Sequence, residues 1–305
     1  MTTTNVDDTS LASKTWFITG SSRGLGAALA EAVLRAGHRV VATSRNPVDL
    51  ARIVAIAPDR ARAVALDVTD PKAARAAIAA AIDAFGRIDV VVNNAGYGNV
   101  ASIEDITEED FRAQFETNFF GVLHVTRAAL PVLRRQRGGH IINVSSIGGR
   151  RGSPGLGAYQ SAKFAVGGLT EVLALEVRPL GIRVTNVEPG GFRTDWGGSS
   201  MTIAKIEPDY EATVGFYAKA IREHAGAAHG DPAKAATAIL GLAAMADPPK
   251  RLLLGTDAMF LAKMVAEERA EEDQANARLS ASTDVDGMPD FADLPIAKML
   301  LDLRK

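Results

Sequence analysis

Residues 16–26 read Trp16-Phe-Ile-Thr-Gly20-Ser-Ser-Arg-Gly24-Leu-Gly26 and are followed by an Ala-rich segment that runs to Ala36. The apolar start predicts a buried strand, the glycines predict a tight turn, and the segment before Gly37 predicts a helix. Such a turn lets the backbone approach a ligand, and the first N–H groups of a helix bind anions such as a pyrophosphate. The spacing differs from the common G-x-G-x-x-G pattern. Two interpretations are open: a nucleotide-binding turn, which we favour, and a plain flexible connection.

Strand and helix patterns alternate from this turn to about residue 255. Short apolar or β-rich runs predict further strands at 39–43, 63–66, 88–92, 139–144, 182–187 and 251–254. The run at 88–92 is almost wholly apolar, as in strands that are covered on both faces. Helical patterns such as Pro71–Phe85 lie between the strands. The alternation predicts an α/β fold: a Rossmann-type doubly wound parallel sheet of about seven strands, with helices on both faces, in a single domain.

The chain divides into three predicted parts. Residues 1–13 are polar, and we expect a disordered lead-in. Residues 14–256 hold the Rossmann-type domain, in which 190–230 is a predicted substrate lid region. Residues 257–305 predict a helical extension, with a charged helix to about Leu279, a polar linker over 280–290 and a short terminal helix. An apolar stripe on the terminal helix needs a covering surface, on this chain or on a neighbouring subunit; it consists of Ile296, Met299, Leu300 and Leu303.

Composition excludes several classes of function. The chain has 305 residues, of which 47% are hydrophobic and 23% charged, and a net charge of −2, so neither a nucleic-acid partner nor a membrane partner is expected. It has no cysteine, and its five histidines form no ligand cluster, so we expect no metal site. No secretion signal or apolar run long enough for a membrane span is seen, which favours a cytoplasmic location.

The end of the second predicted strand bears on cofactor choice. In nucleotide-binding units an acidic side chain here accepts from the ribose 2′-hydroxyl, whereas an arginine binds a 2′-phosphate. This chain has Ser44 and Arg45, with Arg23 in the glycine turn as a second candidate. NADP(H) is therefore favoured over NAD(H), and the alternative is that both arginines are solvated surface residues.

Other candidate residues lie at the carboxyl ends of later strands, where ligands bind in open α/β sheets. Asp67 and Val68 follow the third strand and are placed to flank an adenine ring, and Asn93-Asn94-Ala95-Gly96 follows the fourth, where a plain turn is the alternative. A long helix follows, with one stripe predicted to face the core: Phe111, Phe115, Asn118, Val122, Val125 and Ala129. Asn118 is the one amide in the stripe, with a structural role as the alternative to a functional one.

Tyr159 and Lys163 share one face of a predicted helix, because they are four residues apart. A nearby cation favours the ionised form of a phenol, so this pair suits proton exchange with an alcohol or a carbonyl. Ser145 and Ser146 end the preceding strand. Taken alone, a Tyr-x-x-x-Lys match is weak, because it also occurs by chance on helix surfaces.

Apolar and aromatic side chains gather after the sixth strand, beside Gly197 and Gly198: Phe192, Trp196, Met201, Tyr210, Phe216 and Tyr217. Apolar groups beside flexible glycines suit a lid over a substrate, and an ordinary core is the alternative. The aromatics point to a carbonyl or alcohol substrate that is mostly apolar.

Six motifs occur in order along the chain: Thr19-Gly-Ser-Ser-Arg-Gly-Leu-Gly26, Asn93-Asn-Ala-Gly96, Asn118, Ser146, Tyr159-Gln-Ser-Ala-Lys163 and Pro189-Gly-Gly-Phe-Arg-Thr194. Over residues 14–255 this set resembles the short-chain dehydrogenase/reductase family. The lid aromatics and the ending Leu254-Gly-Thr-Asp257 are similar to the branch of 17β-hydroxysteroid dehydrogenase-like reductases. That branch accepts many substrates, so the resemblance names none.

The resemblance implies roles for the matching residues. Tyr159 is the implied proton donor or acceptor, Lys163 lowers its pKa and holds the nicotinamide ribose, Ser146 binds the substrate oxygen, and Asn118 holds a relay water. Ser146 fits the family spacing to Tyr159 better than Ser145 does. Thr194 is the implied partner of the nicotinamide carboxamide. The candidate cofactor-binding set is Gly20, Ser22, Arg23, Gly24, Leu25, Gly26, Ser44, Arg45, Asp67, Val68, Asn94, Ala95, Gly96, Tyr159, Lys163, Pro189, Gly190 and Thr194.

The sequence thus predicts an NADP(H)-dependent carbonyl reductase or alcohol dehydrogenase that transfers hydride, with Tyr159 as general acid or base. The alternative is a catalytically silent NADP(H)-binding sensor or scaffold. A dehydratase or epimerase of the extended branch is disfavoured by the glycine spacing and by the lack of a large sugar-nucleotide domain. We expect a homo-oligomer, a dimer or tetramer, although the tail after Leu279 can cover an interface or create one. Arg150 and Arg151 are interpreted as surface charges.

Overall fold

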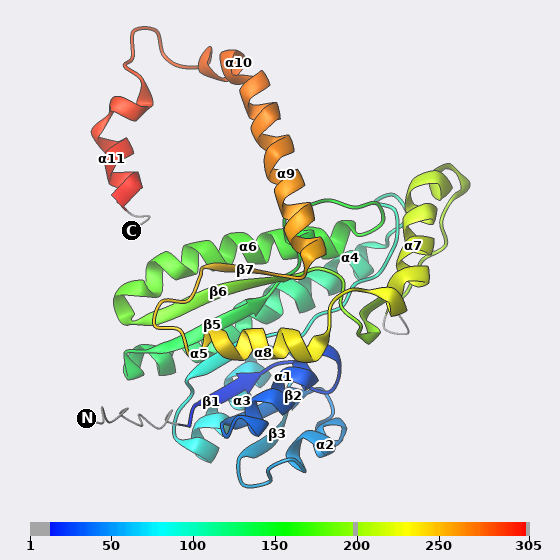
Figure 1. Ribbon diagram of the computed structural model, residues 1–305, viewed down its shortest axis with the longest axis vertical. Helices are drawn as coiled ribbons and strands as arrows, with labels where there is room; N and C mark the ends of the chain where they lie inside the picture. Colours follow the sequence, from blue (N-terminus) through cyan, green and yellow to red (C-terminus); the bar gives the residue numbers. More distant parts are fainter. Residues whose placement is uncertain (1–12, 198–200, 303–305) are drawn as a thin grey trace, which may run out of the picture. The chain divides into compact units, whose positions relative to one another are not determined.

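A seven-stranded parallel sheet in the order β3-β2-β1-β4-β5-β6-β7 runs through the structure, a computed structural model that describes residues 13–197 and 201–302 (Figure 1). The strands are β1 (Thr15–Ile18), β2 (Arg39–Ser44), β3 (Ala61–Ala65), β4 (Val90–Asn93), β5 (Gly139–Val144), β6 (Ile182–Pro189) and β7 (Arg251–Leu254). All six neighbouring pairs are parallel. The predicted Rossmann-type fold is confirmed.

Helices cover both faces of the sheet. The longer helices of this part are α1 (Gly24–Arg35), α3 (Pro71–Phe85), α4 (Glu108–Phe115), α5 (Gly121–Gln136), α6 (Gly157–Val177), α7 (Phe216–His224) and α8 (Pro232–Leu242). Successive strand residues alternate between two apolar clusters, because side chains of a strand point to opposite faces. Trp16 and Ile18 pack with α1 and α8, whereas Phe17 packs with α3, α5 and α6. Two-sided burial explains the near-continuous apolar runs of the strands.

The chain order along the sheet reverses between β1 and β4. From β1 the chain moves outward to β2 and β3, and it then returns to β4 on the other side of β1. The loops after these two strands therefore leave in opposite directions and open a crevice at the strand carboxyl ends. The predicted site residues after β1 and β4 both lie at this crevice.

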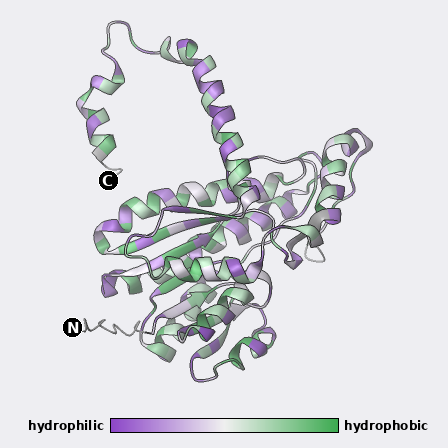
Figure 2. Cartoon of the chain, viewed as in Figure 1, coloured by the Kyte–Doolittle hydropathy of each residue, from purple (hydrophilic) through white to green (hydrophobic). Residues whose placement is uncertain are grey.

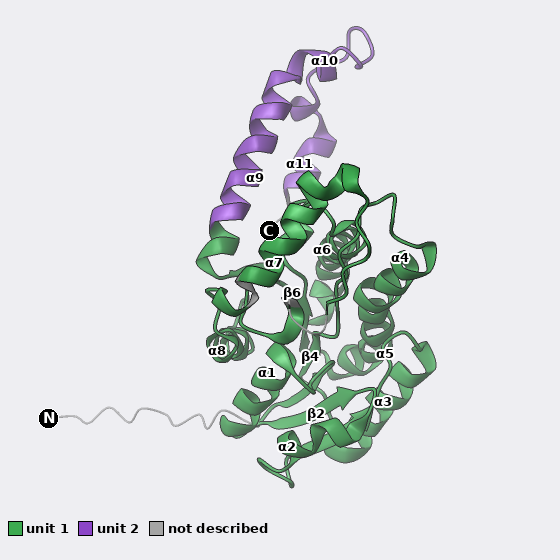
Figure 3. Cartoon of the chain, turned by 90° about the vertical axis from the view of Figure 1, so that its right-hand side faces the viewer, with its two compact units in different colours: residues 1–259 green, residues 260–305 purple. Residues whose placement is uncertain are grey.

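The chain divides into two compact units, residues 1–259 and 260–305 (Figure 3). The second unit holds most of α9 (Thr256–Ala275), together with α10 (Ala277–Ala281) and α11 (Pro295–Asp302). Hydrophilic residues predominate along α9 after its first turns (Figure 2). Ile296, Met299 and Leu300 of the predicted terminal stripe are about half exposed. Leu303 and the predicted lead-in up to residue 12 lie outside the described residues.

Several predicted boundaries differ from the structure. β3 spans Ala61–Ala65 rather than 63–66, because its backbone pairs with β2 from Ala61 onward, even though Arg62 is polar. The predicted polar linker begins inside a helix, since α10 extends to Ala281. The predicted long helix of 111–129 is two helices, α4 and α5, joined by a π-helical turn over Glu116–Phe120. Among the described residues, no helix is long and apolar enough to cross a membrane.

His140 is a buried titratable side chain on β5. It is 6% exposed, and its Nε2 lies 2.9 Å from Thr185 Oγ1. Burial, aided by the positive charges of Lys14 and Arg183, lowers the pKa of His140 from 6.5 to about 4. The folded chain therefore holds this imidazole neutral across a range in which the unfolded chain protonates it.

We predict that the protein loses stability as the pH falls from about 6.5 to about 4. In this range the unfolded chain binds a proton on His140 and the folded chain does not, so protonation favours unfolding; above about 6.5 the contribution is fully present. The total loss from this residue is about 3 kcal/mol. Urea unfolding at several pH values measures it. His140→Gln should show a weaker pH dependence, and His229→Gln, at an exposed position, should not; equal pH dependence in both variants contradicts the assignment.

Candidate active site

The glycine turn between β1 and α1 needs left-handed backbone conformations at two glycines and has no room for a side chain at a third. Gly20 and Gly24 have left-handed φ values of 66° and 56°, which glycine adopts without strain. A Cβ on Gly26 would lie 2.3 Å from the Gly20 carbonyl oxygen and 2.4 Å from Asn94 Nδ2. The N-cap of α1, Arg23, makes no side-chain capping bond. The first N–H groups of α1 therefore remain available to an anion such as a pyrophosphate.

Thr19 and Asn94 join this turn to the loop after β4. Thr19 Oγ1 accepts hydrogen bonds from the backbone N–H groups of Asn94 at 2.9 Å and Ala95 at 3.0 Å. The Asn94 side chain donates to the carbonyl oxygens of Thr19 and Gly20, at 2.9 and 3.1 Å. The Asn-Asn-Ala-Gly motif is therefore more than a plain turn, because its hydrogen bonds fix the position of the glycine turn.

The residues predicted to bind the adenosine half lie at the ends of β2 and β3. Ser44 is buried and its hydroxyl donates to the Asn46 carbonyl at 2.5 Å, whereas Arg45 and Arg23 are exposed. The Asp67 carboxylate accepts from the N–H and hydroxyl groups of Thr69, at 2.9 and 2.8 Å. Val68 is buried. Neither arginine forms an ion pair with an acidic side chain in the described part of the chain.

Arg45 also acts on Tyr97, in the loop after β4. Burial and the charge of Asp110 raise the pKa of Tyr97, and the charge of Arg45 opposes them. The end of β2 and the loop after β4 therefore share one electrostatic environment, with a positive charge at the β2 side.

The π-helical turn places two buried amides against the loop after β4. Asn118 donates from Nδ2 to the carbonyl oxygens of Tyr97 and Gln114, both at 2.9 Å, and its Oδ1 accepts from the Tyr97 N–H at 3.2 Å. Gln114 Oε1 accepts from the Asn99 N–H at 3.3 Å. Sequence reasoning missed Gln114, although it is four residues before Asn118 and therefore on the same helix face.

The predicted stripe on this helix is only partly correct. Asn118, Val122, Val125 and Ala129 are buried, but Phe111 and Phe115 are only partly buried. The π-helical turn adds a residue to one turn and rotates the two helical segments relative to each other. Residues on either side of the turn therefore no longer share a face at the ordinary helical spacing.

The two serines after β5 have different surroundings. Ser145 is buried, and its hydroxyl donates to the Lys163 carbonyl at 3.1 Å. Ser146 is partly exposed, and its Oγ accepts from the Gly148 N–H at 3.0 Å. A side-chain hydrogen bond links Ser146 to the Tyr159 phenol. The structure therefore brings Ser146, and not Ser145, to Tyr159.

Tyr159 and Lys163 lie on the first turns of α6 and are both buried, at 7% and 4% exposure. Lys163 Nζ donates to the Val144 carbonyl at 2.9 Å and lies 5.7 Å from the centre of the Tyr159 ring. A Cβ on Gly96 would lie 2.6 Å from Asn118 Oδ1 and 3.5 Å from Lys163 Nζ. Asn118 and Lys163 thus meet at the same glycine.

Burial dominates the acid–base properties of this pair. It raises the pKa of Tyr159 to about 12, against the smaller opposite effect of the Ser146 hydrogen bond. It lowers the pKa of Lys163 to about 8. The charge of Lys163 is not among the causes of the shift of Tyr159, and the implied role of Lys163 in lowering that pKa stays a prediction. The phenol is protonated at neutral pH.

Trp196, in the lid region, packs directly on Tyr159. The two ring centres are 5.2 Å apart and the planes are tilted by 54°. A Cβ on Gly98 would lie 3.1 Å from the Trp196 ring and 3.3 Å from the Tyr159 ring. Gly98 therefore leaves the space in which these two aromatic rings meet. Spacing along the sequence carries no signal for this contact, since Trp196 is 37 residues from Tyr159.

The described part of the lid region forms a small apolar cluster with the loops beside Tyr159. Val100, Leu156, Met201, Val214 and Ala218 are its buried members. Backbone hydrogen bonds join the three segments: Val100 N–H donates to the Thr202 carbonyl at 2.9 Å, and Ala101 N–H donates to the Gly155 carbonyl at 3.0 Å. The described part of this region thus has a core of its own, and its role as a lid over a substrate stays a prediction. Gly198 lies outside the described residues.

The interpretation of Arg150 as a surface charge is wrong, because Arg150 pairs with a buried carboxylate. Its guanidinium pairs with Glu188 Oε2 at 2.6 Å, and the Glu188 side chain is only 3% exposed. Glu188 also accepts from Asn186 Nδ2 at 2.8 Å. The side chain of Arg150 is long enough to reach from the loop after Ser146 to the end of β6, which joins two loops of the candidate site. Arg151 is partly exposed.

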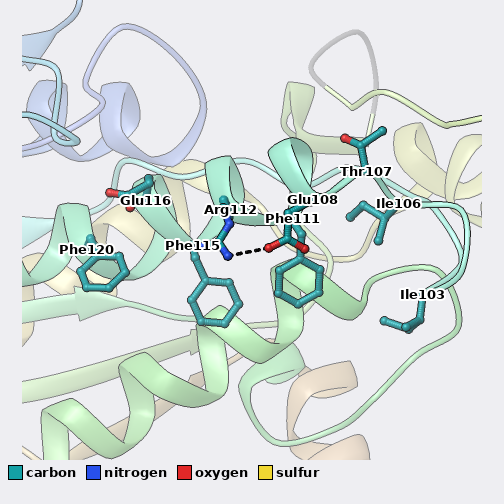
Figure 4. Close-up of a pocket in the computed structure, with 9 residues that line it drawn as sticks. All are labelled: Ile103, Ile106, Thr107, Glu108, Phe111, Arg112, Phe115, Glu116 and Phe120. Carbon is teal, nitrogen blue, oxygen red and sulfur yellow. Dashed lines mark ion pairs between the residues drawn. The ribbon is translucent and has the colours of Figure 1, made fainter.

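An open groove of about 490 Å³ lies along α4 and the π-helical turn (Figure 4). Phe111 and Phe115 stack along it with ring centres 5.5 Å apart, and Arg112 pairs with Glu108 on the same surface. None of the predicted site residues lines this groove. It is therefore separate from the candidate active site.

Comparison with known proteins agrees with the geometry. The sequence pattern of the short chain dehydrogenases matches residues 14–202. The chain is a member of the short-chain dehydrogenase family. It is 50% identical to the "Oxidoreductase BOA17" of Botryotinia fuckeliana over 271 residues, which cover 88% of this chain and 99% of that protein. It is 38% identical to the 3-ketodihydrosphingosine reductase of Bacteroides thetaiotaomicron, over 78% of this chain and 86% of that protein.

A solved structure supports the same assignment. The short-chain dehydrogenase from Streptomyces avermitilis has a TM-score of 0.84 and 39% identity to this chain, over 90% of this chain and all of that one. The chain is thus an oxidoreductase of a family that uses a nicotinamide cofactor. The glycine turn, with free N–H groups and no room for side chains, fits such a cofactor. The resemblance to the 17β-hydroxysteroid dehydrogenase-like branch is compatible with these findings and stays a prediction.

We predict that Gly26→Ala damages the glycine turn, because both groups nearest the new methyl are held in place by the Thr19–Asn94 hydrogen bonds. Overpacking of this kind costs about 1–3 kcal/mol. Thermal unfolding and NADPH titration measure the losses of stability and of binding. Gly241→Ala is the matched control, since nothing lies within 4 Å of its Cβ in α8. Unchanged NADPH binding by Gly26→Ala contradicts the role of the turn.

Proposed function

We propose that this short-chain dehydrogenase is an NADP(H)-dependent carbonyl reductase or alcohol dehydrogenase. The observation that carries the proposal is the convergence of the partly exposed Ser146 with the buried Tyr159 and Lys163 at one site. When bound, the nicotinamide cofactor supplies or accepts the hydride. The side chains of the chain handle the proton and the oxygen.

Each of these side chains has a distinct part. The Tyr159 phenol gives its proton to the carbonyl oxygen during reduction, and the Ser146 hydroxyl donates a hydrogen bond to the charge that grows there. Lys163 holds a positive charge beside the phenol and is the group through which the proton is replaced. Because burial raises the pKa of Tyr159 to about 12, the phenol carries the proton that reduction of a carbonyl requires at neutral pH.

The surroundings of Tyr159 favour a medium-sized, mostly apolar ketone or secondary alcohol. Trp196 covers one side of the Tyr159 ring, and Val100, Leu156 and Met201 form the apolar cluster behind it. Apolar walls with a few oriented polar groups are typical of pockets for such ligands. One relative is a 3-ketodihydrosphingosine reductase, and the reduction of a keto group is compatible with this class of reaction.

The proposed preference for NADP(H) rests on Arg45 and Arg23. Both are exposed, Arg23 within the glycine turn and Arg45 directly after β2. Ser44 stands where an acidic residue would oppose a 2′-phosphate. The homo-oligomer, the cytoplasmic location and the absence of a nucleic-acid partner stay predictions from the sequence.

We predict that Tyr159→Phe lowers kcat by about 10²- to 10⁴-fold and leaves NADPH binding within a few fold of the wild type, because only the proton donor is lost. NADPH depletion with a panel of ketones, and NADPH titration, measure the two quantities. Thr237→Val is the control, since the exposed Thr237 hydroxyl on α8 bonds the Ala233 carbonyl of its own helix. Normal turnover by Tyr159→Phe would contradict the mechanism. A wild-type chain that binds NADPH but reduces none of the ketones would favour the sensor alternative.

We predict that Arg45→Ala raises the KM for NADPH by about 10- to 150-fold and the KM for NADH much less. A charge-assisted hydrogen bond to the 2′-phosphate is worth about 1.5–3 kcal/mol, and NADH has no such phosphate. Initial rates with both cofactors measure the effect. Arg35→Ala, at the exposed far end of α1, removes the same charge away from the crevice and should change neither KM. Equal increases for NADPH and NADH in Arg45→Ala contradict the assignment.

A further inference from the structure

The segment Leu254-Gly255-Thr256-Asp257, which joins β7 to α9, forms hydrogen bonds with the loop after β6. Asp257 Oδ2 accepts a hydrogen bond from the Gly191 N–H at 2.6 Å. Gly190 N–H donates to the Leu254 carbonyl at 2.9 Å. Two adjacent residues of the Pro189–Thr194 loop are therefore bonded to two successive elements, Gly190 to the Leu254 carbonyl at the end of β7 and Gly191 to the Asp257 carboxylate in the first turn of α9.

The Asp257 carboxylate occupies the space that a side chain at residue 190 would need. The three atoms nearest to a Cβ built on Gly190 all belong to Asp257, and both carboxylate oxygens would lie 2.3 Å away. Gly190 does not adopt a left-handed φ, so its backbone conformation does not itself require glycine. The missing side chain at residue 190 is thus needed for Asp257, and not for the turn.

Burial of the second carboxylate oxygen of Asp257 is unfavourable for the stability of the folded chain. Asp257 Oδ1 is buried and has no hydrogen-bond partner in the described part of the chain. A Cβ on Gly255 would lie 2.4 Å from this oxygen. Leaving a buried acceptor without a donor is unfavourable. The hydrogen bond from Gly191 to Oδ2 therefore has to offset part of the free energy that burying Oδ1 costs.

The loop that Asp257 holds reaches the glycine turn at its other end. A Cβ on Gly24 would touch Thr194 Cβ at 3.6 Å. Between these ends, Gly230 N–H donates to the Gly191 carbonyl at 2.9 Å and Arg193 N–H donates to the Gly230 carbonyl at 3.0 Å. Gly191 is therefore bonded on both sides of its backbone, through its N–H to Asp257 and through its carbonyl to Gly230.

We infer that Asp257 is a positioning residue for the cofactor-binding loop Pro189–Thr194. It acts through Gly190 and Gly191, and it sets the path of the backbone that carries Thr194 to the glycine turn. The inference rests on the proposed function, in which this loop binds the nicotinamide end of the cofactor. It explains why Asp257 and Gly190, 67 residues apart, occur together.

Paired substitutions test the inference by two independent readouts. The first is the dissociation constant for NADPH, and the second is the rate of tryptic cleavage after Arg193, an exposed residue in the loop, measured without any cofactor. Asp257→Ala should weaken NADPH binding by about tenfold or more and speed this cleavage, because the Gly191 N–H loses its acceptor. Asp257→Asn should stay near the wild type, since its amide oxygen still accepts from Gly191.

A reciprocal pair makes the test specific to this contact. Gly190→Ala should also weaken NADPH binding, because its methyl group meets the carboxylate. The double variant Gly190→Ala/Asp257→Ala should bind NADPH no worse than Gly190→Ala, since the second change removes the clash. Fully additive losses in the double variant overturn the inference, because independent sites add and coupled ones do not.

Asp89→Ala controls for a loss of stability. The Asp89 carboxylate likewise accepts from a backbone N–H, that of Thr15 at 2.8 Å, but it does so at the opposite, amino-terminal end of the strands. It should lower the unfolding temperature without changing NADPH binding or cleavage after Arg193. Equal weakening of NADPH binding by Asp89→Ala and Asp257→Ala, or wild-type binding by Asp257→Ala, overturns the role of Asp257. A wild-type chain that binds neither NADPH nor NADH instead overturns the proposed function.

Discussion

The hydroxyl of Thr19 is the interaction on which the candidate site depends most. It is buried at the end of β1, accepts hydrogen bonds from the N–H groups of Asn94 and Ala95, and donates to the Val92 carbonyl at 3.3 Å. One side chain thus joins the two strands between which the sheet reverses its order. The glycine turn and the Asn94 loop take their relative position from it. The Thr19 hydroxyl uses its one donor and both of its acceptor sites. A longer polar side chain at this position would place its polar atoms elsewhere and leave a buried group unpaired.

Burial of Tyr159 and Lys163 sets the chemical character of the site. A phenolate and an ammonium are both disfavoured away from water, so the pKa of Tyr159 rises and that of Lys163 falls. Each charged form therefore needs the other, or a ligand, as a partner. The site therefore holds a protonated phenol beside a lysine whose pKa is lowered toward neutrality, and a change at one group is felt by the other because they share a low-dielectric environment.

Polar side chains join the segments that meet at this site. Gln114 and Asn118 bond the backbone of Tyr97 and Asn99, and Arg150 pairs with Glu188 at the end of β6. Asp257, in the first turn of α9, bonds the loop after β6. The backbone of a loop at the edge of the sheet has no sheet ladder to satisfy it, and Gln114, Asn118 and Asp257 supply partners for such backbone groups.

Local patterns in the sequence determined most strands and helices and the fold class, because strand–helix alternation and turn glycines depend on neighbours within a few residues. The ordered motifs, through their resemblance to the family, predicted Ser146 and Lys163 beside Tyr159. Only the tertiary structure decided the rest. The π-helical turn at Asn118 shifts a helix face that ordinary spacing places elsewhere. The contacts of Trp196 with Tyr159, Arg150 with Glu188 and Asp257 with Gly191 join residues 37, 38 and 66 positions apart. Such contacts depend on where the parallel strands end in space, and no periodicity along the chain records that position.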